Sequence, residues 1–296
     1  MKEKGKINFI ISMLIFSSIG IFIRAIPYPS SFVAFVRGTV GFAVILLVML
    51  LKRQKSDRKA IKENFLLLAL SGIFIGINWV ALFESYRYTT VATATLCYYM
   101  APMFVIMVSP FVLGERLTVK KAVCVLTALF GMVLVSGVFE ANRGEIQLKG
   151  IVYGLIAAAF YASVMIINKK MTDIPAFDKT YLQLLFAAAV VAVYNIFTVD
   201  ASSLSADSKH ILLLLFVGVF HTGFAYTLYF GSMKSMKAQS IAILSYIDPV
   251  FALILSAVIL KEQMSLFGII GAVMVLGAAF VCELPPRNKK LAERDI

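Results

Sequence analysis

An acidic residue lies inside a long apolar stretch near the end of the chain, SYIDPVFALILSAVILKEQ, which covers residues 245–263. The acid is Asp248, and Pro249 follows it directly. A carboxylate held among apolar side chains in a membrane costs several kcal/mol unless it faces protein or water, so Asp248 is a candidate functional group. Three roles are open: binding the ammonium group of a ligand, exchanging a proton, or pairing with a neighbouring helix for structural reasons alone.

The same kind of stretch occurs earlier as YYMAPMFVIMVSPFVLGER, residues 98–116. An offset of 147 residues places Pro102 on Pro249 and Glu115 on Glu262, but no acid stands beside Pro102. Each proline removes one backbone donor in mid-helix, so we expect two kinked helices that act as hinges, although membrane helices also tolerate proline without a function. Glu115 and Glu262 end the two stretches, where each either stabilises the turn into the next helix or acts as a gate.

The apolar stretches contain eight further polar or aromatic residues, which we expect to lie inside the membrane. They are Arg37, Asn78, Trp79, Tyr98, Tyr99, His221, Tyr226 and Tyr246. Aromatic faces around an acid suit a cationic or amino-bearing ligand, and we treat all eight as candidate substrate-binding residues together with Asp248. Arg37 either extends to the outer interface or points inward as an anchor for a substrate carboxylate. His221 is either a packing residue or a proton carrier beside Asp248.

The composition indicates an integral membrane protein. Of the 296 residues, 60% are hydrophobic, more than a water-soluble domain of this length covers with polar surface. A hydrocarbon core of about 30 Å requires roughly 20 mostly apolar residues per crossing, and helices satisfy the backbone hydrogen bonds there. The sequence predicts ten such helices, at residues 7–26, 31–51, 65–86, 91–113, 119–139, 149–168, 179–199, 210–231, 237–260 and 265–283.

The basic residues predict the orientation of these helices. Of the 28 Lys and Arg residues, 21 fall at the N-terminus, at the C-terminus and in the loops after the second, fourth, sixth and eighth helices. Because cytoplasmic loops carry an excess of Lys and Arg, we expect a multi-pass cell-membrane protein with both termini in the cytoplasm. Since the net charge of +12 lies in these short loops, without a basic stripe or nucleic-acid motif, we expect no nucleic-acid partner.

The internal repeat predicts an inverted architecture. Five helices per copy is an odd number, so the second copy enters the membrane from the opposite side. We therefore expect an all-α fold of ten transmembrane helices in two inverted five-helix repeats, residues 1–143 and 144–286, followed by a basic cytoplasmic tail at 287–296. Inverted repeats are typical of secondary transporters, which bind substrate near the membrane midplane between the halves.

On these residues the chain resembles the EamA-type transporters of the drug/metabolite transporter superfamily. The resemblance rests on APMFVIMVSPFVLGERLT (101–118), its echo DPVFALILSAVILKEQMS (248–265), and FVRG (35–38), and it extends over both halves. The second copy departs from the first by having Lys261 at the position of Gly114, and the first helix lacks the Trp-Gly pair common in the family. The resemblance implies transport, often export, of amino acids or related small metabolites, and it does not name the cargo.

Other classes of function remain as alternatives. An organic cation or amine needs only Asp248 and the aromatic rings, so a transporter of such compounds is the nearest alternative. An intramembrane enzyme would need a nucleophile with a base or a metal cluster, and no second acid is expected at the depth of Asp248. A channel or a non-transporting sensor is a third class. We expect no cofactor or metal. The expected partners are the lipid bilayer, a small-molecule metabolite and, if Asp248 or His221 titrates, protons, with monomer and homodimer both open.

Overall fold

A computed structural model describes residues 2–115, 117–136, 145–200, 202, 204, 207–233, 236 and 238–284, and in these ranges every regular element is a helix. The helices are α1 (Lys2–Ala25), α2 (Ser30–Leu51), α3 (Arg58–Glu63), α4 (Phe65–Tyr88), α5 (Val91–Tyr98), α6 (Ala101–Val112), α7 (Val119–Val135), α8 (Glu145–Lys170), α9 (Ala176–Thr198), α10 (Ser208–Phe216), the π-helix η2 (Val217–Phe224), α11 (Ala225–Met233), α12 (Ala238–Ser245), α13 (Ile247–Ile259) and α14 (Leu266–Glu283). The expected tail at 287–296 and the boundary between the halves at 143/144 lie outside the described residues.

Eight of the helical segments are long and apolar enough to cross a membrane, and two predicted crossings take other forms. The eight are Lys4–Ala25, Ser30–Leu51, Phe65–Tyr88, Val91–Val112, Gln147–Lys170, Ala176–Thr198, Ser208–Ser232 and Leu266–Glu283. The predicted fifth helix is α7, which has 17 residues. The predicted ninth helix, 237–260, is divided into α12 and α13, because the helix breaks near its proline. The chain is therefore an all-α membrane protein of about ten helices.

The two proline-bearing stretches are both broken helices. α5 ends at Tyr98 and α6 begins at Ala101, with a tight backbone bond from Met100 N–H to the Cys97 carbonyl (3.1 Å) between them. α12 ends at Ser245 and α13 begins at Ile247. Each proline stands in the first turn of the second piece, where its missing N–H is not needed, so each break falls just before the proline.

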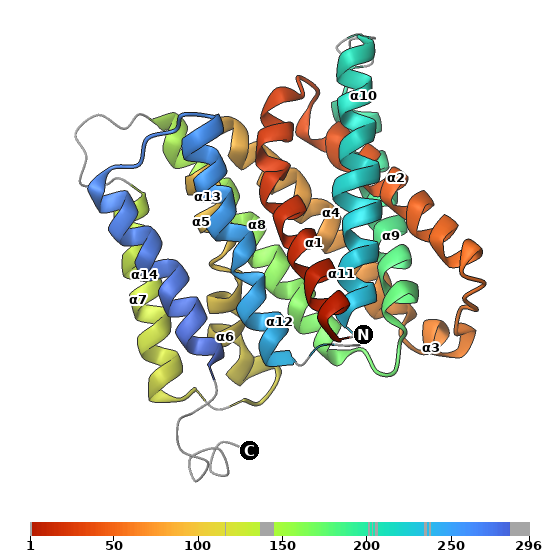
Figure 1. Cartoon of the computed structure of the whole chain (residues 1–296), viewed down its shortest axis with the longest axis horizontal. Coiled ribbons are helices and arrows are strands. Elements are labelled where there is room, and N and C mark those ends of the chain that lie inside the picture. Colours follow the sequence, from red (N-terminus) through yellow and green to blue (C-terminus); the bar gives the residue numbers. More distant parts are fainter. Residues whose placement is uncertain are drawn as a thin grey trace.

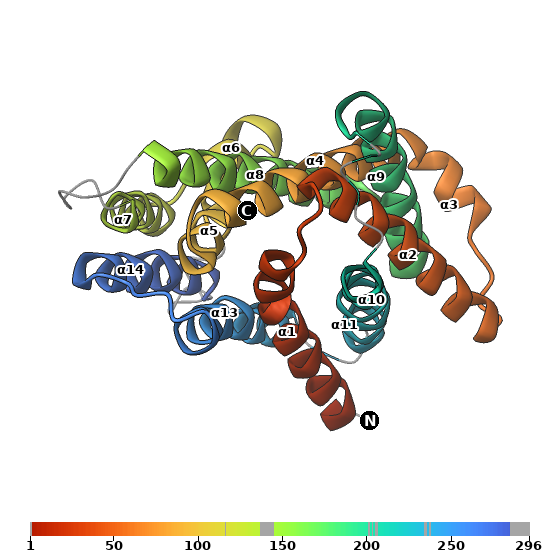
Figure 2. The same cartoon turned by 90° about the horizontal axis from the view of Figure 1, so that it is seen from above.

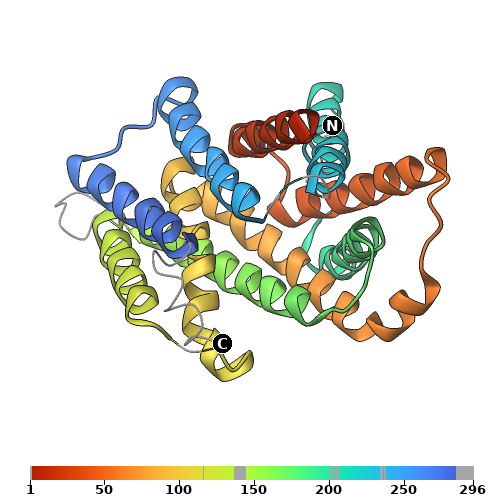
Figure 3. The same ribbon diagram turned by 60° about the horizontal axis from the view of Figure 1, so that its bottom comes forward.

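The helices pack in pairs that combine distant parts of the sequence (Figures 1 and 2). α4 packs against α8 and α9, α7 against α14, and α2 against α9 and η2. α1 contacts both α11 and α13, and α5 contacts both α8 and α13. Figure 3 shows α1 beside the α10–α11 segment, with α7 and α14 together on the other side of the molecule. α1, α5, α8, α11 and α13 thus surround the middle of the bundle.

The bundle has two ends, named here from Figure 1. The lower end holds the start of α1 and the ends of α2, α6, α8 and α14, whereas the upper end holds the start of α5 and the ends of α1, α4 and α13.

Glycine allows α2 to approach η2 closely. A Cβ atom added at Gly223 would lie 2.4 Å from Val44 Cγ1, and one added at Gly41 would lie 2.4 Å from Thr222 Cγ2. Real side chains do not tolerate such distances, so any larger residue here would push the two helices apart. This close contact fixes the position of α2 along η2, and with it which side chains of the two helices lie opposite each other.

Candidate functional site

Asp248 lies in the first turn of α13, immediately after the break in the predicted ninth helix. Its Oδ2 accepts a hydrogen bond from the Tyr99 hydroxyl at 2.8 Å, across the interface between the two broken helices. The positive end of the α13 dipole favours a carboxylate at this position. Asp248 is partly exposed, and among the described residues no basic side chain forms an ion pair with it. Its charge is therefore open to a ligand.

Five tyrosines gather near this carboxylate, and we call them the tyrosine cluster: Tyr98, Tyr99, Tyr161, Tyr226 and Tyr229. The rings of Tyr98 and Tyr161 stack with centroids 5.0 Å apart, and Tyr98 meets Tyr99 edge-on at 6.1 Å. The Tyr161 and Tyr229 side chains both lie within electrostatic range of Asp248 and of Tyr226. All five side chains are partly exposed, Tyr161 by 37%, whereas Cys97 and Met100 on the same broken helix are fully buried. The cluster thus gathers partly exposed rings of α5, α8 and α11 in the neighbourhood of Asp248.

Arg37 is a buried cation without a carboxylate partner among the described residues. Its Nε donates to Thr222 Oγ1 at 2.8 Å, and its guanidinium lies 4.2 Å from the ring centre of Trp79. The Phe83 ring lies 5.6 Å away. Arg37 is 5% exposed, so it points into the protein rather than toward the membrane interface. Aromatic faces and one hydroxyl leave most of the hydrogen-bonding capacity of this guanidinium unused.

Arg37 and Asp248 have neighbouring tyrosines in common. Tyr226 and Tyr98 of the tyrosine cluster lie within electrostatic range of the guanidinium. Tyr86 of α4 lies within electrostatic range of both Arg37 and Asp248. The cation and the acid therefore border the same group of tyrosines, with no direct contact between them.

His221 sits in the middle of η2 and is fully buried. Its Nε2 lies 3.0 Å from the Ser18 hydroxyl, and Phe22, Phe216 and Phe220 surround the ring with centroids within 5.7 Å. Its Nδ1 has no hydrogen-bond partner among the described residues, and no contact joins it to Asp248. The histidine thus links α1 to η2 inside an aromatic pocket, next to the Thr222 that holds Arg37.

Two expected site residues face elsewhere. The amide of Asn78 donates to the Ala157 carbonyl at 2.6 Å and joins α4 to α8. Tyr246 occupies the break between α12 and α13, and its ring meets Phe280 of α14 edge-on at 5.5 Å. The structure therefore does not bring these two side chains to the tyrosine cluster.

The two repeat-related glutamates lie at opposite ends of the bundle in different surroundings. Glu262 at the upper end accepts hydrogen bonds from the backbone N–H groups of Val91 and Ala92 and pairs with Arg24 at 3.3 Å. Glu115 at the lower end pairs with Lys169 and, at 3.4 Å, with Lys121. The hydrogen bond from Lys169 holds the pKa of Glu115 below its ordinary value.

Sequence reasoning missed Tyr161 and Tyr229. Both lie outside the matched segments 98–116 and 245–263. The position of a residue along its helix predicts its depth in the membrane but not the direction in which its side chain points. One signal was available for Tyr161, because tyrosines of membrane helices gather at the interfaces and this one stands in mid-helix. Tyr229 lies near the end of its helix and gave no such signal.

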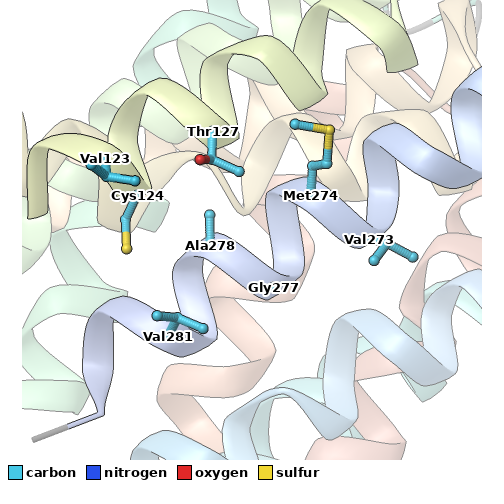
Figure 4. A pocket seen from close by; sticks show the side chains of 8 residues that line it. All are labelled: Val123, Cys124, Thr127, Val273, Met274, Gly277, Ala278 and Val281. Atoms are coloured by element: carbon cyan, nitrogen blue, oxygen red, sulfur yellow. The ribbon is translucent and has the colours of Figure 1, made fainter. Parts of the chain in front are cut away.

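Two cavities are separate from this group of side chains. One of about 270 Å³ lies between α7 and α14 and is lined mainly by apolar residues (Figure 4). Another of about 350 Å³ is lined by Tyr28 and Phe32 together with aliphatic side chains. Neither lining includes Asp248, Arg37 or a member of the tyrosine cluster.

Helices of membrane-crossing length, two of them broken beside an acid and a cluster of tyrosines, define a polytopic α-helical membrane protein. The model of the EamA-like transporter family matches residues 3–137 and 148–283, once in each half. The chain belongs to this family, within the drug/metabolite transporter superfamily, and is a transporter rather than an enzyme.

Curated relatives agree with this membership. An uncharacterized transporter of Bacillus subtilis (strain 168), YxxF, is 28% identical over 275 residues, which are 93% of this chain and 88% of the relative. An uncharacterized transporter of Archaeoglobus fulgidus is 26% identical over 94% of this chain and 95% of its own length. A solved crystal structure covers 99% of both chains with a TM-score of 0.67 and 19% identity, which supports the fold alone.

Proposed function

We propose that this protein is a secondary transporter that exports a small polar or amphipathic metabolite, such as an amino acid, by alternating access around the tyrosine cluster. The observation that carries the proposal is the Tyr99–Asp248 hydrogen bond, which places between two broken helices an acid that has no ion-pair partner in the described part of the chain. Discontinuous helices at the interface of two repeats are where secondary transporters bind substrate. Export as the direction rests on the resemblance to EamA-type transporters.

The packing supports ten crossings in two inverted repeats. If α1 corresponds to α8, α2 to α9, α4 to α10–α11, α5–α6 to α12–α13, and α7 to α14, then most of the extensive contacts exchange in pairs, although the α2–α4 contact has no comparable counterpart between α9 and the α10–α11 segment. The α4–α8 contact becomes the contact of α11 with α1, and the α1–α13 contact becomes that of α8 with α5 and α6. The α7–α14, α2–α9 and α5–α13 contacts map onto themselves. A twofold axis between the halves produces this pattern, and five crossings per half would place that axis in the membrane plane. The charge of the loops favours a cytoplasmic lower end.

Asp248 and Arg37 would divide the recognition of a zwitterion. An ammonium group fits Asp248, with the faces of Tyr98 and Tyr161 around it. A carboxylate fits Arg37, because within the residues that the structure describes only its Nε has a polar partner. The alternative substrate, an organic cation or amine, would use Asp248 and the rings and leave Arg37 as a part of the α2–η2 contact.

Binding to purified protein separates these substrates. We expect a thermal-stabilisation screen of amino acids and amines to find a ligand whose affinity falls at least tenfold in Asp248→Asn. A zwitterionic ligand also loses affinity in Arg37→Gln, whereas a cationic ligand does not. Unchanged affinity in both variants for every ligand found would remove the proposed site.

Proton coupling needs a separate test because it rests on the depth of Asp248 and His221. Uptake into proteoliposomes with an imposed pH gradient measures it. If Asp248 exchanges a proton in each cycle, flux follows the gradient in the parent protein and becomes independent of it in Asp248→Asn. Flux that ignores the gradient in the parent indicates facilitated diffusion.

A further inference from the structure

A carboxylate at the upper end joins helices that surround the middle of the bundle. Glu262 follows α13, and its side chain is 8% exposed. It accepts hydrogen bonds from Val91 N–H at 2.9 and 3.1 Å and from Ala92 N–H at 3.4 Å, the first amides of α5. The Ser256 hydroxyl of α13 donates to the same carboxylate. Glu262 thus caps the broken helix that carries Tyr99 and fastens it to the broken helix that carries Asp248.

Arg24 extends this contact to two more helices. One terminal nitrogen lies 3.3 Å from Glu262 Oε1, and it also donates to the Thr89 carbonyl at 2.5 Å. Its Nε donates to the Tyr86 carbonyl at 2.9 Å. Arg24 is the second-last residue of α1, and these carbonyls lie at the end of α4. We call Arg24, Glu262, Ser256 and the α5 amides the upper latch, because together they hold α1, α4, α5 and α13 at one end.

The repeat places the same residue types at the lower end. Glu115 and Ser109 each precede Glu262 and Ser256 by 147 residues, and Lys169, like Arg24 in the first half, stands at the end of the first long helix of its half. The backbone is alike in both loops, since Glu262 N–H donates to the Ser256 carbonyl at 3.2 Å and Glu115 N–H to the Ser109 carbonyl at 3.4 Å. Glu115, Ser109 and Lys169 form the lower latch.

The side chains of the two latches are arranged differently. The Ser256 hydroxyl binds Glu262, whereas the Ser109 hydroxyl donates to the Ile106 carbonyl at 3.1 Å. The side chain of Glu115 is 33% exposed against 8% for Glu262, and that of Lys169 is 57% exposed against 37% for Arg24. The same sequence pattern thus adopts two arrangements. Glu262 is buried in a hydrogen-bond network, whereas Glu115 is partly exposed.

We propose that Arg24 and Glu262 form the outer gate of the transport route, and that Lys169 and Glu115 form its inner counterpart. The inference rests on the proposed alternating-access function. In this structure the outer pair lies in a network with a buried carboxylate, whereas the inner pair is formed but exposed, so we infer that the outer side is the closed one. In the opposite state Glu115 would cap the start of α12, at Ala238, as Glu262 caps α5 here, and the Arg24–Glu262 network would be broken. Because both latches lie where the bundle meets water, their charged groups become hydrated on opening, which offsets the loss of their partners.

The test measures access from outside and requires no substrate. A single reporter cysteine replaces Ala94, which is fully buried on α5 below Val91, in a background where Cys97, Cys124 and Cys282 are serine. A membrane-impermeant maleimide is added to right-side-out vesicles. We expect Arg24→Gln and Glu262→Gln to raise the labelling rate at least fivefold, and we expect Glu115→Gln and Lys169→Gln to leave it unchanged or lower. If the inner and outer variants raised the labelling rate equally, the substitutions would have loosened the whole protein, which would overturn the proposal. A labelling rate in Glu262→Gln equal to that of the parent protein would overturn it as well.

Two serines provide a milder, matched pair of variants should Glu262→Gln fail to fold. Ser256→Ala removes one hydrogen bond to Glu262, while Ser109→Ala removes a hydroxyl of the same type that does not bind Glu115. We expect at least twofold faster labelling in the first and the parent rate in the second. The same rate in both variants contradicts the gate. Since labelling is independent of cargo, a failed transport assay alongside asymmetric labelling would reject the proposed substrate site and leave the gate standing.

Discussion

The hydroxyl of Tyr99 donates to the carboxylate of Asp248 at 2.8 Å and thereby connects the two broken helices of the molecule. Tyr99 stands in the break between α5 and α6, and Asp248 stands just after the break between α12 and α13. A movement of one broken helix relative to the other therefore changes the environment of the candidate substrate-binding acid. This relationship joins the proposed site to the proposed movement.

Removing the hydroxyl of Tyr99 should weaken binding of an amine at Asp248. In Tyr99→Phe the ring stays, but the carboxylate loses the donor that orients it, and hydrogen bonds to charged groups contribute about 1.5–3 kcal/mol. We expect roughly a tenfold loss of affinity, measured by calorimetry with the ligand from the screen. Tyr246→Phe is the matched control, since Tyr246 packs against Phe280, and it should bind as the parent does. Equal affinities in Tyr99→Phe and the parent would show that the hydrogen bond plays no part in binding.

Trp79 is the single tryptophan of the chain and reports directly on Arg37. The guanidinium lies 4.2 Å from the centre of the indole. A ligand carboxylate that binds Arg37 should shift the cation on the ring and change the emission excited at 295 nm, in a saturable way. Arg37→Gln should remove the change. A saturable signal of the same size in Arg37→Gln would mean that the ligand does not reach the arginine.

Lys261 stores strain that glycine avoids at the repeat-related position. Lys261 has φ of 54° and Gly114 has φ of 67°, both in the left-handed region. Side chains in this region cost about 1 kcal/mol relative to glycine, and Lys261 is exposed, so its replacement loses little contact. We expect Lys261→Gly to raise the apparent melting temperature in detergent by about 2 °C.

Gly114→Ala is the reverse experiment. A Cβ at Gly114 would meet no atom within 4 Å, so only the backbone conformation opposes alanine there. We expect the melting temperature to fall by a similar amount of about 2 °C. No change in either variant would show that these turns relax at no cost. A lower melting temperature in Lys261→Gly would show that the lysine stabilises its turn, which also contradicts the assigned strain.

Glu115 should make the stability of the lower end depend on pH. Its pKa lies below the ordinary value because Lys169 donates to it, so the folded state favours the ionised form. The resulting stabilisation is fully present above the pKa of the unfolded chain and is lost as pH falls through the folded pKa. Glu115→Gln should thus lower the melting temperature slightly at pH 7 and have less effect near pH 3. If the loss of melting temperature in Glu115→Gln became larger toward low pH, the Glu115–Lys169 pair would not be the cause of the stabilisation.

The sequence predicts much of this fold because its strongest signals are physical requirements of the bilayer. Apolar length locates the helices, and Pro102 and Pro249 mark the two breaks to within a few residues. The direction of a side chain around its helix is harder to predict. Tyr246 stands in a break where the helical phase changes, so it faces Phe280, while Tyr161 and Tyr229 join the cluster through helix contacts that no local pattern encodes.

The most direct test of the account is counterflow in proteoliposomes with the ligand found by the screen. We predict that substrate loaded inside accelerates uptake of labelled substrate in the parent protein, and that Asp248→Asn, with parent-like melting temperature and insertion, loses at least nine-tenths of this flux. Uptake indifferent to substrate on the opposite side, or full counterflow in Asp248→Asn, would contradict a carrier that binds its cargo at Asp248.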